Sequence, residues 1–370
     1  MPTALVIGGT GPTGPYVVNG LIDRGYQVTI MHTGRHEVAE ITDRVTHIHT
    51  NPFDQAESET ALGSATYDLA VVMYGRLRVL APLLVGRVGR LVTIGGVGAV
   101  RGWSDPGDLF PAAMTVPAHP QTMLAPVDDP VGKLRRIVET EQVVFDTHPD
   151  AIHLRYPMLY GPRQLVPREW PLVRRALDRR QILVLPDGGL TLKSVAYVEN
   201  AAHAVMCAVD APASALGQSF NITDTRLLTL AQVAEIIADE LGHSFEIESV
   251  PAQFAVPARP LLMHWSSTHR VVNIDSARSV LGYEDVVEPE QAVRRTTQWL
   301  VANPPTDKTI KAIQDPFDYP AEDAFISRWR QMTAGFEPPA FDPTPGYGAA
   351  YYGRKPNPAT GTSRVEPTSS

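Results

Sequence analysis

The sequence predicts an α/β fold in which a doubly wound parallel sheet carries a smaller C-terminal lobe and an irregular proline-rich tail. Three observations predict it. Short apolar runs alternate with helical patterns through the first half of the 370 residues, as in sheets covered by helices on both faces. A glycine-rich loop separates the first apolar run from the first helical pattern. After Gly161-Pro162 the order of elements changes, which indicates a second lobe.

Six apolar runs are expected as strands of the sheet. They are residues 4–7, 27–31, 45–49, 69–73, 90–94 and 151–154. The stretch 16–24, directly after the glycine loop, has a helical pattern of apolar residues. Because connections between parallel strands are right-handed, strands joined by helices in this way form a doubly wound sheet.

Helical patterns continue in the second half of the chain. One helix is expected to begin with Asp129 as N-cap and Pro130 at its first position, and to run to residue 145. Residues 103–130 hold six prolines and are expected to cross the surface. Further helices are expected at 170–180, 230–241 and 289–301, and a strand at 194–198.

These elements predict three parts. Residues 1–160 form the first domain, to which 194–220 return, and residues 161–193 and 221–303 form the second lobe. Residues 304–370 form an extension with one helix, at 321–332, followed by a tail rich in proline and glycine.

Composition narrows the class of protein. Hydrophobic residues make up 44% and charged residues 19% of the chain, and the formal net charge is −8. This acidic balance makes nucleic acid an unexpected partner. The single cysteine, Cys207, fits a reducing compartment. No run approaches the roughly 20 apolar residues of a membrane-spanning helix, and no charged leader precedes the first strand. We therefore expect a cytoplasmic protein that is not bound to a membrane.

The glycine loop carries the strongest functional signal. Gly8, Gly11 and Gly14 are spaced three apart between a strand and a helix. The first allows a tight turn, the second lets the backbone approach a pyrophosphate, and the third permits close packing of helix and strand. The pattern predicts a Rossmann-type site for a nicotinamide dinucleotide. The residues expected to form it are Gly8, Thr10, Gly11, Pro12, Thr13 and Gly14.

The end of the second strand bears on the choice of cofactor. NAD-binding proteins usually place a carboxylate there for the ribose 2′-hydroxyl, but none precedes Glu37 in this stretch. Arg35 and His32, with the Thr33 hydroxyl, could instead meet a 2′-phosphate, which favours NADP over NAD. The alternative is that Arg35 is a solvated turn residue. Asn51, after the third strand, is expected beside the adenine.

Two later segments resemble signatures of a known family. Residues 154–162 read Leu-Arg-Tyr-Pro-Met-Leu-Tyr-Gly-Pro and look like its "LR-P---YGP" element. Residues 197–204 resemble its later "V-D-A-A" element. Together with the glycine loop, they resemble the NAD-dependent epimerase/dehydratase family, the extended branch of the short-chain dehydrogenases/reductases, over residues 1–300. The resemblance implies a Rossmann domain, a small C-terminal substrate lobe and a homodimer.

The resemblance also implies chemistry by a serine and a Tyr-x-x-x-Lys pair, and here the chain departs from the family. Residues 93–98, where the serine is expected, read Thr-Ile-Gly-Gly-Val-Gly. Lys133 matches the family's lysine, for which the resemblance implies ribose binding, but the residue four positions before it is Asp129. The usual serine and tyrosine are therefore absent, and protonation requires another donor.

Tyr74, Asp129 and Tyr160 are candidates for the proton donor, and Lys133 is the fourth candidate catalytic residue. Tyr74 follows the fourth strand, at the edge where open α/β sheets bind ligands, and could donate a proton to a substrate carbonyl. Wall packing is its alternative role. Asp129 could act as acid or base, although N-capping explains an aspartate directly before Pro130. Tyr160 lies in the signature and is expected to line the site. A bound water is a further alternative donor.

Two arginines follow the signature at the entrance to the second lobe. Arg163 and Arg168 could hold a substrate carboxylate or phosphate, for which the guanidinium fork is suited. Four more arginines crowd residues 174–180, a pattern typical of a solvated face. RNA contact is the weaker alternative, because the net charge is acidic.

Histidines do not indicate a metal site by their spacing. His32 and His36 form one pair of chain neighbours, and His47 and His49 form another. Neither pair has a third ligand at a recognised spacing, so no metal is expected.

The sequence therefore predicts an NADP(H)-dependent oxidoreductase with a non-standard proton donor. Its substrate is expected to be a small organic carbonyl or alcohol, held between the Rossmann domain and the second lobe. One alternative is an epimerase or dehydratase that uses the cofactor transiently. Another is a non-catalytic protein that senses the cofactor or binds RNA.

Overall fold

A computed structural model describes residues 1–35, 37–41, 43–73, 77–104, 109–122, 124, 132–262, 267–342 and 346. For Lys133 and Leu134 it describes the backbone alone. The chain divides into two compact units, Met1–Pro316 and Phe317–Ser370, and each is described by itself.

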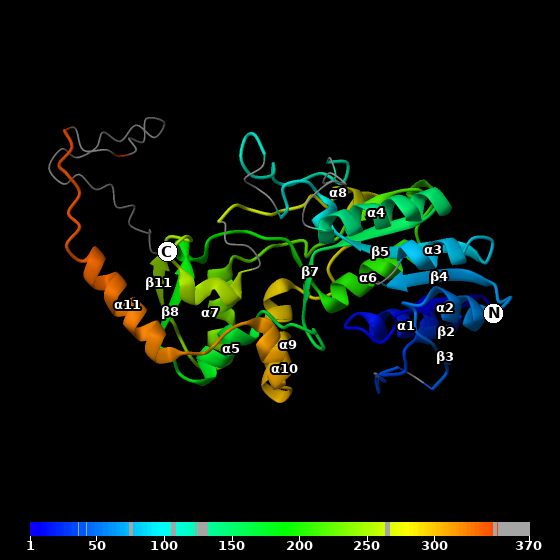
Figure 1. The fold of residues 1–370 in the computed structure, drawn as a ribbon, viewed down its shortest axis with the longest axis horizontal. Helices are drawn as coiled ribbons and strands as arrows, with labels where there is room; N and C mark the ends of the chain where they lie inside the picture. The colour runs from blue at the N-terminus through cyan, green and yellow to red at the C-terminus, as the bar shows by residue number, and fades with distance from the viewer. Residues whose placement is uncertain are drawn as a thin grey trace, which may run out of the picture. The chain divides into compact units, whose positions relative to one another are not determined.

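The first unit is built on a seven-stranded parallel sheet (Figure 1). The strand order β10-β6-β5-β4-β1-β2-β3 runs outward from β1 in both directions, as in a doubly wound sheet. The strands are β1 (Thr3–Ile7), β2 (Gln27–His32), β3 (Thr46–His49), β4 (Tyr67–Met73), β5 (Val88–Gly96), β6 (Ile152–Tyr156) and β10 (Ser219–Asn221). The predicted α/β fold with a Rossmann-type sheet is confirmed.

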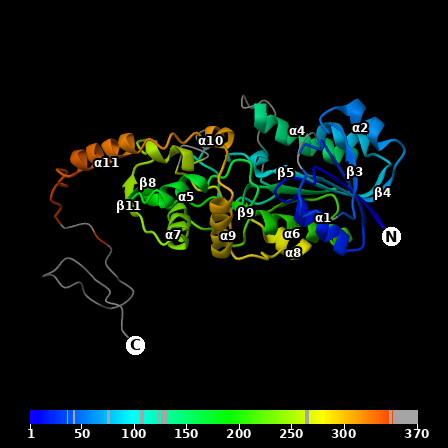
Figure 2. The same cartoon turned by 90° about the horizontal axis from the view of Figure 1, so that it is seen from below.

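Alternate residues of the strands pack into two different cores. Along β1, Ala4 and Val6 belong to one core, and Leu5 and Ile7 belong to the other. The first core also holds side chains of α1 (Gly14–Asp23), α6 (Val198–Val209) and α8 (Asp275–Leu281), which lie side by side in Figure 2. The second core holds side chains of α2 (Gln55–Leu62), α3 (Leu77–Leu83) and α4 (Gly132–Thr147). Burial on both faces explains why the strands read as continuous apolar runs.

The second lobe is built on a two-stranded parallel sheet and three helices. The strands are β8 (Ile182–Pro186) and β11 (Glu246–Val250). The helices are α5 (Trp170–Leu177), α7 (Leu230–Glu240) and α9 (Pro289–Ala302), which contact one another. A second parallel pair, β7 (Met158–Tyr160) and β9 (Val195–Tyr197), follows the main sheet. Short 3-10 helices lie at Val97–Ala99, Asp187–Gly189, Ala213–Ala215 and Val256–Leu261.

One segment differs from the predicted division of the chain. The sequence placed residues 221–303 in the second lobe, but α8 packs against the main sheet. Ile274, Ala277 and Leu281 are buried in the core that also holds α1 and α6. The chain therefore returns to the Rossmann core before α9, because this apolar helix face buries its surface there.

The region after residue 304 holds two helices in its described part, where the sequence predicted one. The first, α10 (Asp307–Ile313), is N-capped by Thr306 and belongs to the first unit. After it, the buried Asp315 accepts hydrogen bonds from Arg175 at 2.7 and 3.3 Å. The second helix, α11 (Tyr319–Thr333), belongs to the second unit. Among the described residues, no helix combines the length and apolar character needed to cross a membrane.

Candidate active site

The glycine loop lies at the carboxyl end of β1, where the strand order reverses. Gly8 has a φ of +92°, and a Cβ there would lie 2.8 Å from the Met73 carbonyl oxygen. A Cβ on Gly14 would lie 2.1 Å from the Gly9 carbonyl oxygen. The nearest described atom to a Cβ on Gly11 is the Gly8 carbonyl oxygen, 3.8 Å away. The fold itself requires the first and third glycines, whereas Gly11 borders open space.

The N-terminus of α1 lies at this loop, where Pro15 has no N–H and the Gly14 N–H donates to the Gly11 carbonyl oxygen at 2.9 Å. Thr13 is the N-cap residue, but its side chain accepts no hydrogen bond from the turn, and the turn contains no acidic residue. The positive end of a helix dipole binds phosphate groups well. Together with the space beside Gly11, this arrangement fits the pyrophosphate of a dinucleotide. Thr10 and Pro12 complete the loop that would hold it.

The end of β2 presents fewer side chains that could bind a 2′-phosphate than the sequence predicted. The His32 side chain is only 4% exposed. Its Nε2 hydrogen bonds His47 Nδ1 at 2.9 Å, and its Nδ1 accepts the Gly34 N–H at 3.3 Å. Burial lowers the pKa of His32, so the ring is uncharged near neutral pH. Thr33 and Arg35 are exposed, which leaves Arg35 as the cation available to a 2′-phosphate.

Asn51 is used locally at the start of α2. Its Oδ1 accepts the Phe53 N–H at 3.2 Å, and its own N–H donates to Glu57 at 3.3 Å. The side chain thus shapes the turn that begins the helix. Contact with the adenine stays a prediction.

The carboxyl end of β5 is shaped by a buried histidine. A Cβ on Gly95 would lie 2.3 Å from His153 Nε2. His153 is held in place by a 2.7 Å hydrogen bond between its Nδ1 and Thr93 Oγ1. By contrast, the nearest described atom to a Cβ on Gly96 is Ile137 Cδ1, at 3.8 Å. The imidazole therefore explains the glycine at position 95 but not the glycine at position 96.

The structure describes the predicted catalytic residues to different extents. Tyr74 and Asp129 lie outside the described residues, and the backbone of Lys133 lies in the first turn of α4. The hydroxyl of Tyr160 donates to Asp224 Oδ2 at 2.8 Å. Burial, and then the charge of Asp224, raises the pKa of Tyr160 well above its ordinary value. Tyr160 therefore keeps its proton and is a poor acid.

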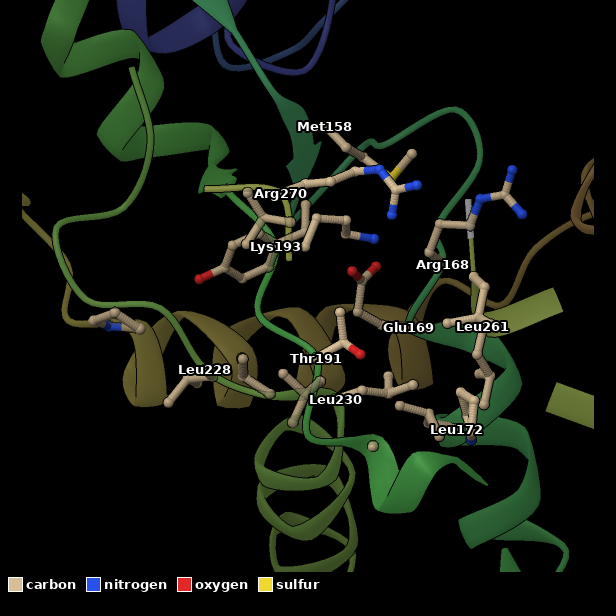
Figure 3. A pocket seen from close by; sticks show the side chains of 18 of the residues that line it. Met158, Arg168, Glu169, Leu172, Thr191, Lys193, Leu228, Leu230, Leu261 and Arg270 are labelled. Atoms are coloured by element: carbon tan, nitrogen blue, oxygen red, sulfur yellow. The ribbon is translucent and has the colours of Figure 1, made fainter. Parts of the chain in front are cut away.

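A pocket opens in the second lobe, between β7, the start of α5 and the chain after β8 (Figure 3). Its empty volume is about 1180 Å³, which includes its open mouth. Most of its wall is apolar. That wall includes Met158, Leu172, Val195, Leu228, Leu230, Val233, Leu261, Leu262 and Val293. The body of a molecule bound here would therefore be largely hydrophobic.

Charged residues gather on one side of this pocket. They are Arg168, Glu169, Lys193 and Arg270. In Figure 3 the carboxyl group of Glu169 and the amine of Lys193 point toward each other. Lys193 and Arg270 are backbone partners in a parallel β-bridge, which places their side chains together although 77 positions separate them in the sequence (270 − 193).

Several polar atoms of this cluster have no hydrogen-bond partner among the described residues. They are Arg168 Nε, Glu169 Oε2 and the Nη2 atom of Arg270. Glu169 also occupies the N-cap position of α5 without capping it by its side chain. Buried polar atoms are normally satisfied, so these atoms are available to a bound polar group.

Burial tunes the titration of the same cluster. Withdrawal from water raises the pKa of Glu169 to about 7. It lowers the pKa of Lys193 to about 8, with Arg168 and Arg270 adding to the decrease and Glu169 opposing it. Asp224, on the pocket wall beside Tyr160, also has its pKa raised to about 7, mainly by burial. The pocket thus offers groups that can hold or release a proton near neutral pH.

Comparison with known proteins shows which enzymes the chain is similar to. No family model matches it. A 3-diazoavenalumate denitrifying reductase from a Streptomyces species is 27% identical over 301 residues, which cover 76% of this chain and 95% of the relative. A decarboxylating sterol-4-alpha-carboxylate 3-dehydrogenase from Schizosaccharomyces pombe is 28% identical over 174 residues, or 40% of this chain and 49% of the relative.

Solved structures agree in fold. UDP-glucose 4-epimerase from Thermotoga maritima, with UDP-glucose, matches at a TM-score of 0.63 and 17% identity, over 81% of this chain and 99% of the other. A dTDP-glucose 4,6-dehydratase from Bacillus anthracis, in complex with NAD, matches at 0.60 and 16%, over 85% and 100%. The chain is therefore similar in sequence to reductases and dehydrogenases of the extended short-chain dehydrogenase/reductase type and shares their fold.

The second lobe is the part of the site that the sequence predicted least completely. Arg168 lines the pocket. Arg163 is not among its lining residues and forms an ion pair with Glu40. Glu169, Lys193 and Arg270 were not predicted. The available signal was a charged residue inside an otherwise apolar stretch, as at Lys193 between Leu192 and Val195, but such a signal is weak without the fold.

Restoring the serine of the short-chain dehydrogenases/reductases after β5 is expected to succeed at one position and fail at the other. Gly95→Ser should lower the free energy of unfolding by about 1–3 kcal/mol, the usual cost of overpacking, because its Cβ overlaps the His153 ring. Gly96→Ser should stay close to the wild type. Urea unfolding of both variants measures the difference, and equal losses would contradict the role given to His153.

Proposed function

We propose that this chain is an NAD(P)-dependent oxidoreductase, with NADP preferred, that acts on a small organic anion. The observation that carries the proposal is the charged side of the pocket, which Arg168, Lys193 and Arg270 line together with one carboxyl group, that of Glu169. With all four groups charged, the cluster has an excess of two positive charges. An anionic substrate group would balance that excess, and its apolar body would lie against the leucine-rich wall.

The polar atoms of this cluster support an oxygen-rich anionic group in particular. Arg168 Nε and the Nη2 atom of Arg270 lack partners among the described residues, and N–H donors of arginine bind carboxylate and phosphate oxygens well. The name of one relative, sterol-4-alpha-carboxylate 3-dehydrogenase, contains a carboxylate. A carboxylate is therefore the anionic group that we propose first.

When bound, the nicotinamide supplies or accepts a hydride at the substrate carbon. The chain's own residues must then hold and move the proton. Tyr74 stays our proposal for the donor near the end of β4, and bound water is its alternative. Glu169, with a pKa raised by burial to about 7, is suited to exchange a proton inside the pocket.

Cofactor binding tests the first half of the proposal. Titration of the cofactor-free protein with NADPH and with NADH, followed by nicotinamide fluorescence, should show binding of both and a lower Kd for NADPH. Arg35→Ala should remove the preference for NADPH without weakening NADH, because only NADPH carries the 2′-phosphate. Tighter binding of NADH to the wild type would contradict the role given to Arg35.

Turnover tests the second half. Oxidation of NADPH with 4-carboxybenzaldehyde should exceed that with its methyl ester, since only the acid carries the charge. Lys193→Met should lower the acid-to-ester ratio of kcat/KM by about 10-fold to 100-fold, the value of one charge-assisted hydrogen bond. The ratio should also fall as the pH rises through about 8, where Lys193 loses its charge.

A matched control separates this effect from loss of net charge. Lys308 is exposed on α10, so Lys308→Met removes the same charge outside the pocket and should leave the ratio unchanged. Equal effects of the two variants would contradict the anion site. Substrate turnover without net oxidation of NADPH would instead favour the epimerase or dehydratase alternative. We further propose a cytoplasmic homodimer, and analytical ultracentrifugation tests the dimer.

A further inference from the structure

Three histidines and a glutamate meet beside the carboxyl ends of β2 and β3. His32, Glu37, His47 and His49 each offer one ligand atom, and these atoms all lie within 4.8 Å of one another. The ring centroids of the three histidines are 4.9 to 5.7 Å apart. This cluster lies outside the pocket.

Strand register brings these residues together. His32 on β2 and His49 on β3 are direct partners in the parallel pair, as are Ile30 and His47. Because side chains alternate along a strand, His47 and His49 point to the same face. The segment after β2 then folds back so that Glu37 reaches all three rings. Spacing along the sequence paired His32 with His36, which lies outside the described residues. It indicated no third ligand, because spacing does not show which strands are neighbours.

We propose that His32, Glu37, His47 and His49 bind one divalent transition-metal ion, with zinc as the expected metal. Three imidazoles and one carboxylate make a complete four-coordinate set of the type that zinc accepts. Calcium and magnesium prefer all-oxygen sites, and imidazole selects for zinc, copper or nickel instead. With neutral rings, Glu37 supplies the single negative charge against the ion.

The distances between the ligand atoms fit such a site. A tetrahedral zinc ion with bonds of about 2.0–2.1 Å requires its ligand atoms to be about 3.3 Å apart. The measured separations are 2.9 Å for His32 Nε2 and His47 Nδ1, and 3.3 Å for His49 Nε2 and Glu37 Oε1. Glu37 lies 3.9 Å from each of His32 and His47. The remaining pairs lie within 4.8 Å, so the ligand atoms would draw together as the ion replaces the His32–His47 hydrogen bond and the proton of that bond leaves.

Exposure also suits an ion that enters from solvent. The His49 and Glu37 side chains are 56% and 55% exposed, whereas His32 is 4% exposed at the base of the cluster. A bound ion would tie the segment after β2 to both strands. That segment holds Thr33 and Arg35, so metal binding would order the residues proposed to read the cofactor.

Direct metal binding tests the proposal without any enzyme assay. The full-length chain, purified and stripped with a chelator, is titrated with zinc chloride by calorimetry and with cobalt chloride by visible absorption. We expect one zinc ion per chain, and the strong visible bands of four-coordinate cobalt. His47→Gln and His49→Gln should each weaken zinc binding by at least about 100-fold, since even outer partners of metal ligands are worth about 10-fold to 100-fold.

Two further variants keep the test decisive. His119 is exposed and outside the cluster, so His119→Gln should bind zinc like the wild type. Glu37→Gln alters only a half-exposed side chain, and should fold normally while losing affinity. No zinc binding by the wild type would overturn the proposal. Binding that survives His49→Gln and Glu37→Gln unchanged would overturn it as well, because the ion would then lie elsewhere.

Discussion

Gly14→Ala is expected to abolish binding of NAD(P)H, whereas Gly11→Ala should weaken it in a protein that stays fully folded. A Cβ added at position 14 would lie 2.1 Å from a backbone oxygen of the same loop, and backbone cannot yield as a flexible side chain can. The loop must therefore rearrange, at a cost of about 1–3 kcal/mol or more. The loop and the positive end of α1 then lose the alignment that phosphate binding needs.

Gly11 provides the matched comparison for this prediction. Its Cβ would meet the nearest described atom at 3.8 Å, so the free energy of unfolding should change by less than about 1 kcal/mol. The added methyl group occupies the space through which the pyrophosphate approaches the backbone, and the Kd for NADPH should rise about 10-fold or more. Fluorescence titration and urea unfolding of both variants measure the two effects. Unchanged cofactor affinity in both would mean that the cofactor binds elsewhere.

Glu141→Ala is expected to be the most destabilising single change near the site. Glu141 is 5% exposed on α4, and it accepts hydrogen bonds from Arg155 Nε at 2.9 Å and from Ser219 Oγ at 2.8 Å. Removing the carboxylate leaves the guanidinium of Arg155, itself 4% exposed, with the Pro120 carbonyl as its other described partner. Breaking a buried ion pair in this way costs about 3–5 kcal/mol.

The same helix supplies the control for Glu141. Glu139 lies two residues earlier on α4 and pairs with Arg135 and Arg78 near the surface. Glu139→Ala should cost far less, because water replaces the lost partner. Urea unfolding at pH 7 compares the two variants. A similar loss for both would show that the Glu141–Arg155 pair is not the source of the stability.

The free energy of unfolding should also decrease in acid, because the buried groups His153 and Glu141 take up protons there. Burial lowers the pKa of His153 to about 4, so its neutral form stabilises the fold above pH 6.5 and that contribution is lost as the pH falls toward 4. For Glu141, burial opposes but does not cancel the effect of Arg155 and His153, and the net pKa is lowered. Its contribution is lost as the pH falls through that lowered pKa. Unfolding free energies measured from about pH 7 to about pH 4 should decrease, and a flat profile would contradict the burial of the His153 ring.

Features that depend on neighbours in the chain could be predicted from the sequence. The glycine loop is one such feature, because three glycines spaced three apart between an apolar strand and a helix are typical of a dinucleotide-binding loop. The helix 230–241 is another, since its apolar period is a local signal, and the structure places α7 at Leu230–Glu240. Apolar runs buried on both faces likewise indicated the parallel sheet.

Features that depend on which strands and loops become neighbours could not be predicted in this way. The return of α8 to the main sheet follows from an apolar face that would suit either lobe. The charged side of the pocket joins Glu169, Lys193 and Arg270 from three separate segments. The pairing of Lys193 with Arg270 follows from a β-bridge that no local pattern encodes.

The sequence by itself determined the Rossmann-type sheet, the position of the dinucleotide loop and the absence of a serine at residues 95 and 96. These follow from local backbone geometry and from apolar periodicity, which act over a few residues. Only the tertiary structure decided that His153 occupies the space beside Gly95, that His32 faces His47 and His49, and that Lys193 faces Glu169. Each of these contacts depends on strand order and burial, because side chains distant in sequence change one another's packing and charge only after the sheet has brought them together.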